Sequence, residues 1–191
     1  MIMRKELAHS FNIQLEKEMA HKLKNEQDKL SKEFNERRFY DSSPHLAIAT
    51  KFMDETMTQI FAEVLTDEFK NDVPWELGFA NFRPSETGDY IFLHFNTESR
   101  QKLFDLHERA FRVTKGIGSE IPNGKKFRYF EYHPHLSLIK LKPEEVPRAL
   151  VILNKDFSGV KMPVTQYELT RQLDDEKGFS TFPTSTKIHL K

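Results

Sequence analysis

The chain contains two copies of a five-residue motif. Residues 44–48 read Pro44-His45-Leu46-Ala47-Ile48, and residues 134–138 read Pro134-His135-Leu136-Ser137-Leu138, which places the two histidines 90 positions apart. The same offset of 90 positions aligns the aromatic Tyr40 with Phe130, and a pair of acidic residues follows each copy of the motif. The sequence therefore indicates a duplicated unit, in which a strand leads into the start of a helix.

The geometry of a β-strand determines which residues of the motif share a face. Side chains alternate between the two faces of a strand, so His45 and Ala47 point to one side, and His135 and Ser137 do the same in the second copy. If the two units pack about a pseudo-twofold axis, the histidines converge from opposite walls of one cleft. Two imidazoles can then act as acid and base, because the ordinary pKa of histidine is about 6.5. The Ser137 hydroxyl, on the same face, can bind an anionic oxygen held between them.

Composition limits the classes of protein to consider. The 29 basic and 29 acidic residues balance, which argues against a protein that grips long duplex nucleic acid. A short or single-nucleotide ligand fits this balance better. The chain has no cysteine, so disulfides, thiolate zinc sites and a cysteine nucleophile are excluded. Because no apolar stretch reaches the length of a membrane span and the N-terminus does not resemble a secretory signal, we expect a cytoplasmic monomer with no membrane partner.

The order of expected elements indicates one bilobal domain over residues 1–191. Hydrophobic periodicity and turn residues predict strands at about 11–15, 44–50, 73–79, 90–95 and 134–141, helices at about 16–38, 54–70, 98–115 and from 143, and a terminal hairpin formed by 161–171 and 179–190. This order predicts an α+β fold with two pseudo-symmetric lobes of antiparallel sheet and flanking helices around a central cleft.

Three further residues are candidates for contact with a ligand. His133 is spaced to share a face with His135, so it could line the cleft or form a metal pair with it. No supporting carboxylate cluster accompanies the two, so zinc is not expected. In the terminal hairpin, Arg171 could contact a phosphate and Tyr167 could stack on a base, although a structural role is favoured for both.

These motifs resemble the 2H phosphoesterase superfamily, whose members carry two His-x-Thr/Ser-x tetrapeptides on equivalent strands. The pair here is His45-Leu46-Ala47-Ile48 and His135-Leu136-Ser137-Leu138, and the element order is similar to that fold from about residue 11 to residue 190. The resemblance implies chemistry without a metal or another cofactor on 2′,3′-cyclic or 2′-5′ phosphodiester bonds of RNA ends and nucleotides. The superfamily includes the proteins called 2′-5′ RNA ligases.

The first copy departs from the family pattern at Ala47, where the pattern has Thr or Ser. Thr50 lies an odd number of residues from His45, so in a regular strand it falls on the buried side. The loss of one hydrogen bond to a charged group costs about 1.5–3 kcal/mol, or one to two decades in rate. Three hypotheses remain open: an enzyme, a non-catalytic module that binds RNA ends or nucleotides, and an unrelated α+β protein whose histidines lie far apart.

Overall fold

The structure, a computed structural model, describes residues 7–35, 45–119, 132–153, 157–171, 173–174, 180–181 and 184–191. The outer match of the repeat, Tyr40 with Phe130, lies outside these ranges. The helices are α1 (Lys17–Phe34), the 3-10 turn η1 (Glu55–Met57), α2 (Thr58–Phe69), α3 (Thr97–Val113) and α4 (Val146–Ile152). The strands are β1 (Leu7–Gln14), β2 (His45–Met53), β3 (Trp75–Pro84), β4 (Tyr90–Phe95), β5 (Leu136–Lys140), β6 (Lys161–Val164), β7 (Gln166–Arg171), β8 (Leu173–Asp174), β9 (Ser180–Thr181) and β10 (Thr184–His189).

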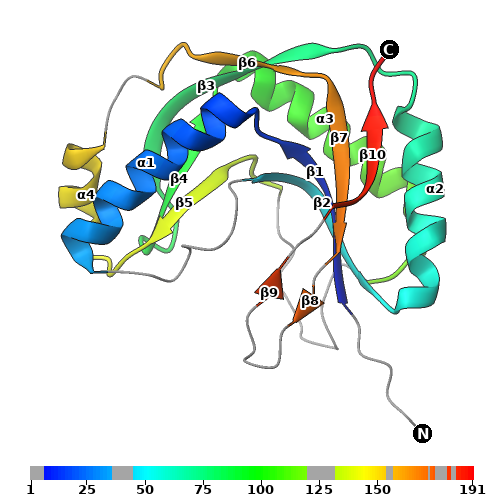
Figure 1. The fold of residues 1–191 in the computed structure, drawn as a ribbon, viewed down its shortest axis with the longest axis horizontal. Helices are drawn as coiled ribbons and strands as arrows, with labels where there is room; N and C mark the ends of the chain where they lie inside the picture. The colour runs from blue at the N-terminus through cyan, green and yellow to red at the C-terminus, as the bar shows by residue number, and fades with distance from the viewer. Residues whose placement is uncertain are drawn as a thin grey trace, which may run out of the picture.

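Two antiparallel four-stranded sheets form the body of the molecule (Figure 1). The first has the order β10-β7-β1-β2 and the second has the order β5-β4-β3-β6. Read from the histidine-bearing strand outward, β2-β1-β7-β10 corresponds to β5-β4-β3-β6, which is the pseudo-symmetry that the repeat predicts. The predicted α+β fold with two lobes of antiparallel sheet is confirmed.

The predicted terminal hairpin is only partly correct. Residues 166–171 form β7 and pair with β10, but the preceding residues form β6, which joins the second sheet by pairing with β3. Thr165 separates β6 from β7, so the chain passes from one sheet to the other within one residue. The tail therefore supplies an outer strand to each lobe and ties the two lobes together.

Local capping explains where two of the helices begin. Asn96 precedes α3, and its side-chain oxygen accepts a hydrogen bond from the backbone N–H of Ser99 at 2.9 Å. Asp54, the predicted cap of the helix after β2, accepts from the N–H of Thr56 at 2.8 Å and so begins η1, which leads into α2. None of the helices within the described ranges is long and apolar enough to cross a membrane.

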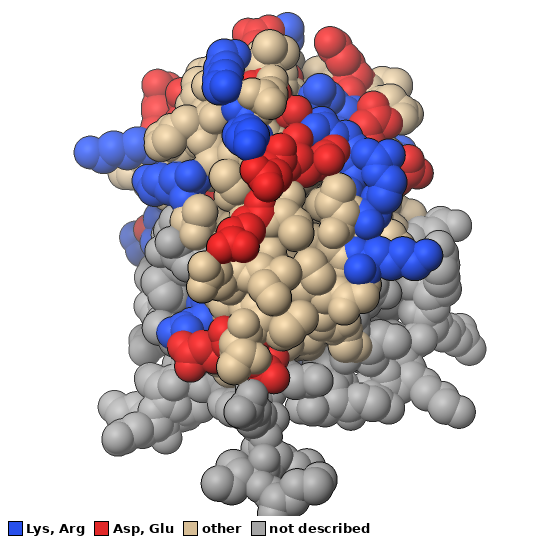
Figure 2. All heavy atoms as spheres, turned by 90° about the vertical axis from the view of Figure 1, so that its right-hand side faces the viewer, with Lys and Arg blue, Asp and Glu red and all other residues tan. Residues whose placement is uncertain are grey.

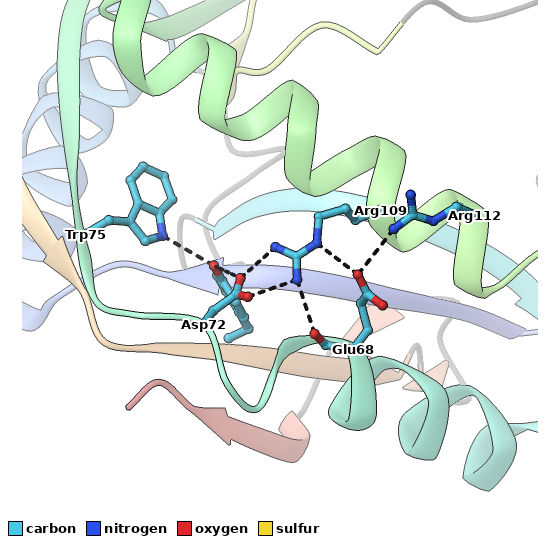
Figure 3. A network of polar contacts seen from close by, with 6 residues as sticks. Glu68, Asp72, Trp75, Arg109 and Arg112 are labelled. Carbon is cyan, nitrogen blue, oxygen red and sulfur yellow. Dashed lines mark hydrogen bonds and ion pairs between the residues drawn. The ribbon is translucent and has the colours of Figure 1, made fainter.

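An aromatic cluster and a polar network join α2, α3 and the first sheet. The ring centroids of Phe11 and Phe69 lie 4.7 Å apart, and Tyr167, fully buried, packs edge-on against both. Figure 3 shows the network beside them, in which the Arg109 guanidinium donates to Glu68 and Asp72 at 2.9–3.1 Å. These contacts give Tyr167 a structural role.

On the side of the molecule that α2 presents, charges of both signs are interspersed. Figure 2 shows basic and acidic side chains next to one another over the upper part of this face. Lys70 and Asp67, near the end of α2, form one such pair at 2.7 Å. Exposed pairs of this kind contribute little to stability.

Candidate functional site

Each histidine-bearing strand contains a β-bulge at the equivalent position. In β2, Ala47 pairs with Asn12 whereas Ala49 pairs with Phe11, which leaves Ile48 as the extra residue. In β5, Ser137 pairs with Phe92 whereas Ile139 pairs with Ile91, which leaves Leu138 as the extra residue. Ile48 and Leu138 are 90 positions apart, so the repeat extends to an irregularity of the backbone.

The backbone carbonyl of each bulge residue accepts a hydrogen bond from a helix of the other lobe. Helix α1 follows β1 of the first sheet, and α3 follows β4 of the second sheet. Gln27, on α1, donates through Nε2 to the Leu138 oxygen at 2.7 Å, and His107, on α3, bonds through Nδ1 to the Ile48 oxygen at 2.7 Å. Because a carbonyl only accepts, His107 Nδ1 carries the proton. Gln27 and His107 are 80 positions apart, as are the first residues of α1 and α3. The two lobes are therefore interlocked by a symmetric exchange of helices.

Tyr132 joins the two histidine-bearing segments directly. Its hydroxyl donates to the carbonyl oxygen of Ala47 at 3.1 Å, and its ring stacks on His107 with centroids 4.1 Å apart. Burial raises the pKa of Tyr132, so the hydroxyl remains protonated and able to donate. Figure 1 shows the first residues of β2 and β5 approaching each other near the centre of the molecule. His45 lies two residues before Ala47, and His135 lies three residues after Tyr132.

We call the side of each sheet that carries the repeated residues its site face. In the first sheet the site face carries His45 and Ala47, and in the second it carries His135 and Ser137. The expectation that Thr50 falls on the buried side is wrong, because it assumed a regular strand. The bulge at Ile48 reverses the alternation, so Thr50 pairs with Ser10, and their hydroxyl oxygens lie 2.9 Å apart. Thr50 thus lies on the same face as Ala47.

The surroundings of His135 fix its tautomer and its charge. Nδ1 lies 2.6 Å from the carbonyl oxygen of His133, so Nδ1 carries a proton and Nε2 is left as the acceptor of the neutral ring. The ring stacks on Phe92, with centroids 3.9 Å apart and planes inclined by 25°. Burial lowers the pKa of His135, against the opposing effect of the His133 carbonyl. The ring is therefore neutral near pH 7.

The other predicted residues lie in different places. Ser137 is exposed and pairs across the strands with Phe92. His133 is exposed, and its Nε2 lies 3.8 Å from a carboxylate oxygen of Glu86. Arg171 lies elsewhere: it pairs with His9, which neighbours Ser10 and so faces the opposite side of the first sheet, and it forms an ion pair with Glu55. Within the described ranges no three His, Asp or Glu side chains gather to hold a metal ion.

Sequence reasoning missed the basic residues on and beside the second site face. His94 follows Phe92 by two residues on β4, and the centroids of their rings lie 6.3 Å apart. Burial lowers the pKa of His94, and the charges of Arg83 and Arg100 lower it further. The repeat gave no signal for this cluster, because the first lobe has Gln14 at the position 80 residues before His94.

Comparisons with known proteins agree with this geometry. The family model described as the 2′-5′ RNA ligase superfamily matches residues 13–176. Among solved structures, E. coli LigT complexed with phosphate has a TM-score of 0.68 at 12% identity and covers 97% of this chain and 98% of its own. LigT complexed with 3′-AMP has a TM-score of 0.67 at 13% identity, with the same coverage. TT0787 of Thermus thermophilus has a TM-score of 0.65 at 18% identity and covers 95% of this chain and 97% of its own. No curated protein sequence matches the chain.

Proposed function

Because the chain belongs to the 2′-5′ RNA ligase superfamily, we propose that it is a metal-independent phosphoesterase that acts on 2′,3′-cyclic or 2′-5′ phosphodiester bonds of RNA ends or nucleotides. The hydrogen bond from Tyr132 to the Ala47 carbonyl carries the proposal, because it joins the segment before His135 to the strand that begins with His45. The solved LigT structures complexed with phosphate and with 3′-AMP support a nucleotide phosphate as the ligand.

In the proposed reaction His135 is the base and His45 is the acid. The bond from Nδ1 to the His133 carbonyl leaves Nε2 of His135 to take a proton from water, and the lowered pKa favours the neutral ring that this step needs. As the water oxygen bonds to phosphorus, the bond from phosphorus to a ribose oxygen breaks, and His45 gives its proton to that oxygen. General acid and base catalysis contributes about 10²–10⁴-fold per group.

Hydroxyl groups hold the phosphate oxygens in this scheme. Ser137 donates from the second site face, where it is exposed beside His135. Ala47 leaves the equivalent position of the first site face without a donor. Thr50 is the nearest hydroxyl residue along β2 on that face, and its oxygen is already bonded to Ser10 at 2.9 Å. Stabilisation of the equatorial oxygens, where charge accumulates, therefore comes mainly from the second lobe.

Ala47 also favours a second candidate function, a module that binds RNA ends or nucleotides without converting them. The missing hydroxyl removes one hydrogen bond to the developing charge, worth about 1.5–3 kcal/mol, while both imidazoles remain able to bind a phosphate. Such a module shows saturable binding of 2′-phosphate products and no turnover of their cyclic precursors.

A substrate screen separates the two functions. The purified protein is incubated with EDTA and with 2′,3′-cyclic mononucleotides or 2′-5′ linked dinucleotides, beside the double variant His45→Ala/His135→Ala. His21→Ala, which changes an exposed histidine of α1, is the matched control. We expect turnover by the wild type and by the control in EDTA, and none by the double variant. Equal turnover by the double variant on every substrate would overturn the proposed function.

A further inference from the structure

The second site face carries a cluster of basic side chains beside His135. Arg83, on β3, pairs with Phe92 across the strands, so it lies on the face on which Phe92 stacks against His135. His94 lies on the same face, beside Phe92. Arg100 belongs to the first turn of α3, directly after β4, and its guanidinium lies 5.5 Å from the centroid of Phe104, whose ring contacts Tyr132. Arg83 and His94 therefore lie on the second site face with His135, and Arg100 lies beside the ring that contacts Tyr132.

These groups have unused capacity to bind an anion. Arg83 and Arg100 are both exposed, and neither forms an ion pair with another residue in the described part of the chain. The Nε2 atom of His94 is buried and has no hydrogen-bond partner among the described residues. A guanidinium group offers several donors in a plane and binds phosphate oxygens in pairs, so two such groups next to an imidazole suit a phosphate dianion or diester.

The described part of the first lobe has no counterpart to this cluster. At the positions 80 residues earlier, Gln14 takes the place of His94 and Ala20 takes the place of Arg100. The first site face carries instead an amide and hydroxyl pair, in which Asn12 donates to Thr170 at 2.7 Å. Because the backbone of the two lobes follows the pseudo-symmetry, a basic cluster on one side only indicates a ligand whose charge is unevenly distributed.

We propose that Arg83, His94 and Arg100 form a subsite for a second phosphate group of the substrate, next to the phosphate that lies between the two histidines. This inference rests on the proposed function for the first phosphate. It narrows the substrate class to an RNA end or nucleotide that carries a further phosphate, such as the 5′ phosphate of the terminal nucleoside, in preference to a cyclic mononucleotide with a single phosphate.

Binding of two product-like ligands tests the subsite without the need for turnover. Calorimetry compares the Kd of adenosine 2′-phosphate with that of adenosine 2′,5′-bisphosphate at one salt concentration. One charge-assisted hydrogen bond is worth at least about tenfold in affinity, so we expect the bisphosphate to bind about tenfold more tightly. In the double variant Arg83→Gln/Arg100→Gln this preference should fall below about twofold, with the Kd of the monophosphate unchanged.

The control is Arg148→Gln, which removes an exposed arginine of α4 that pairs with Glu33 and should leave the tenfold preference intact. The inference is overturned if the wild type binds both ligands equally, or if the double variant keeps the preference. Equal binding of both ligands with turnover of cyclic substrates leaves the proposed function standing and removes only the subsite. A preference that depends on the arginines, without turnover of any substrate, supports the subsite and removes the catalytic proposal.

Discussion

The two lobes repeat one backbone and carry different chemistry on it. Both contain a bulged edge strand with a histidine near its start, and in both the bulge carbonyl is bonded by a helix from the other lobe. The first site face bears hydroxyl and amide groups, among them Thr50 and Asn12, whereas the second bears Phe92, His94 and His135. Under the proposed function, this backbone positions the two imidazoles, and the difference between the faces gives each a separate task.

The largest effect should come from changing one histidine at a time. His45→Gln and His135→Gln each remove one partner of the acid and base pair, so kcat should fall by about 10²–10⁴-fold in either variant. The loss in the double variant should be far smaller than the product of the two single losses, because the groups act as a unit. Steady-state kinetics on the best substrate of the screen measures this. A loss confined to one histidine would show that the lobes do not share the chemistry.

The next test removes the hydroxyl group of the second lobe and, in a separate variant, adds one to the first lobe. Ser137→Ala should lower kcat/KM by about 10- to 100-fold, because the phosphate loses one hydrogen bond to a charged group. Ala47→Thr should raise kcat/KM by a similar factor, since β-branched side chains suit a strand and Ala47 is only half-buried. If Ser137→Ala lowers activity while Ala47→Thr leaves it within about twofold, another group already serves the first lobe, and Thr50 is the first residue to examine.

The parts of this site that depend on local sequence could be predicted, whereas the parts that depend on contacts between distant residues could not. The strands that begin at His45 and next to His135 follow from a local pattern, as does the helix after Asp54. The position of Thr50 does not, because a bulge at Ile48 is not visible in the alternation of apolar residues. The assignment of β6 to the second sheet depends on pairing with β3, whose residues are more than 80 positions away.

The exchange of helices between the lobes, and the place of His94, were missed for a different reason. The repeat has an offset of 90 positions at the histidines but 80 at Gln27 and His107, because the stretch from the first residue of α3 to His135 is ten residues longer than the stretch from the first residue of α1 to His45. A comparison at a single offset finds only the histidine units. His94 carries no signal at all, since its counterpart is Gln14, and it was found only from its contact with Phe92.

The exchanged helices give a matched pair of stability measurements. Gln27→Met leaves the carbonyl of Leu138 without its partner, and His107→Phe does the same to Ile48 while keeping a ring to stack on Tyr132. Each should lower the free energy of unfolding in urea by about 1–3 kcal/mol. Gln27→Met should fall at the lower end, because it also removes a buried amide oxygen that lacks a partner among the described residues.

The control for this pair is Gln101→Met, which changes an exposed glutamine of α3 bonded to Asp105 at 3.0 Å. It should change the free energy of unfolding by less than about 0.5 kcal/mol. Gln27→Met and His107→Phe could change the free energy of unfolding as little as the control does. In that case water bonds to the bulge carbonyls in place of the two side chains, and the interlocking of the lobes does not contribute to stability.

The smallest effect should be a shift along the pH axis. Because burial lowers the pKa of His135 below 6.5, the wild type should lose activity only as the pH falls through that lowered value, where the base becomes protonated. Phe92→Leu removes the stacked ring and admits water, so the pKa should rise toward 6.5 and the acidic limb of the kcat/KM profile should move to higher pH. If Phe92→Leu moves the basic limb of the kcat/KM profile instead, His135 is the acid and His45 is the base.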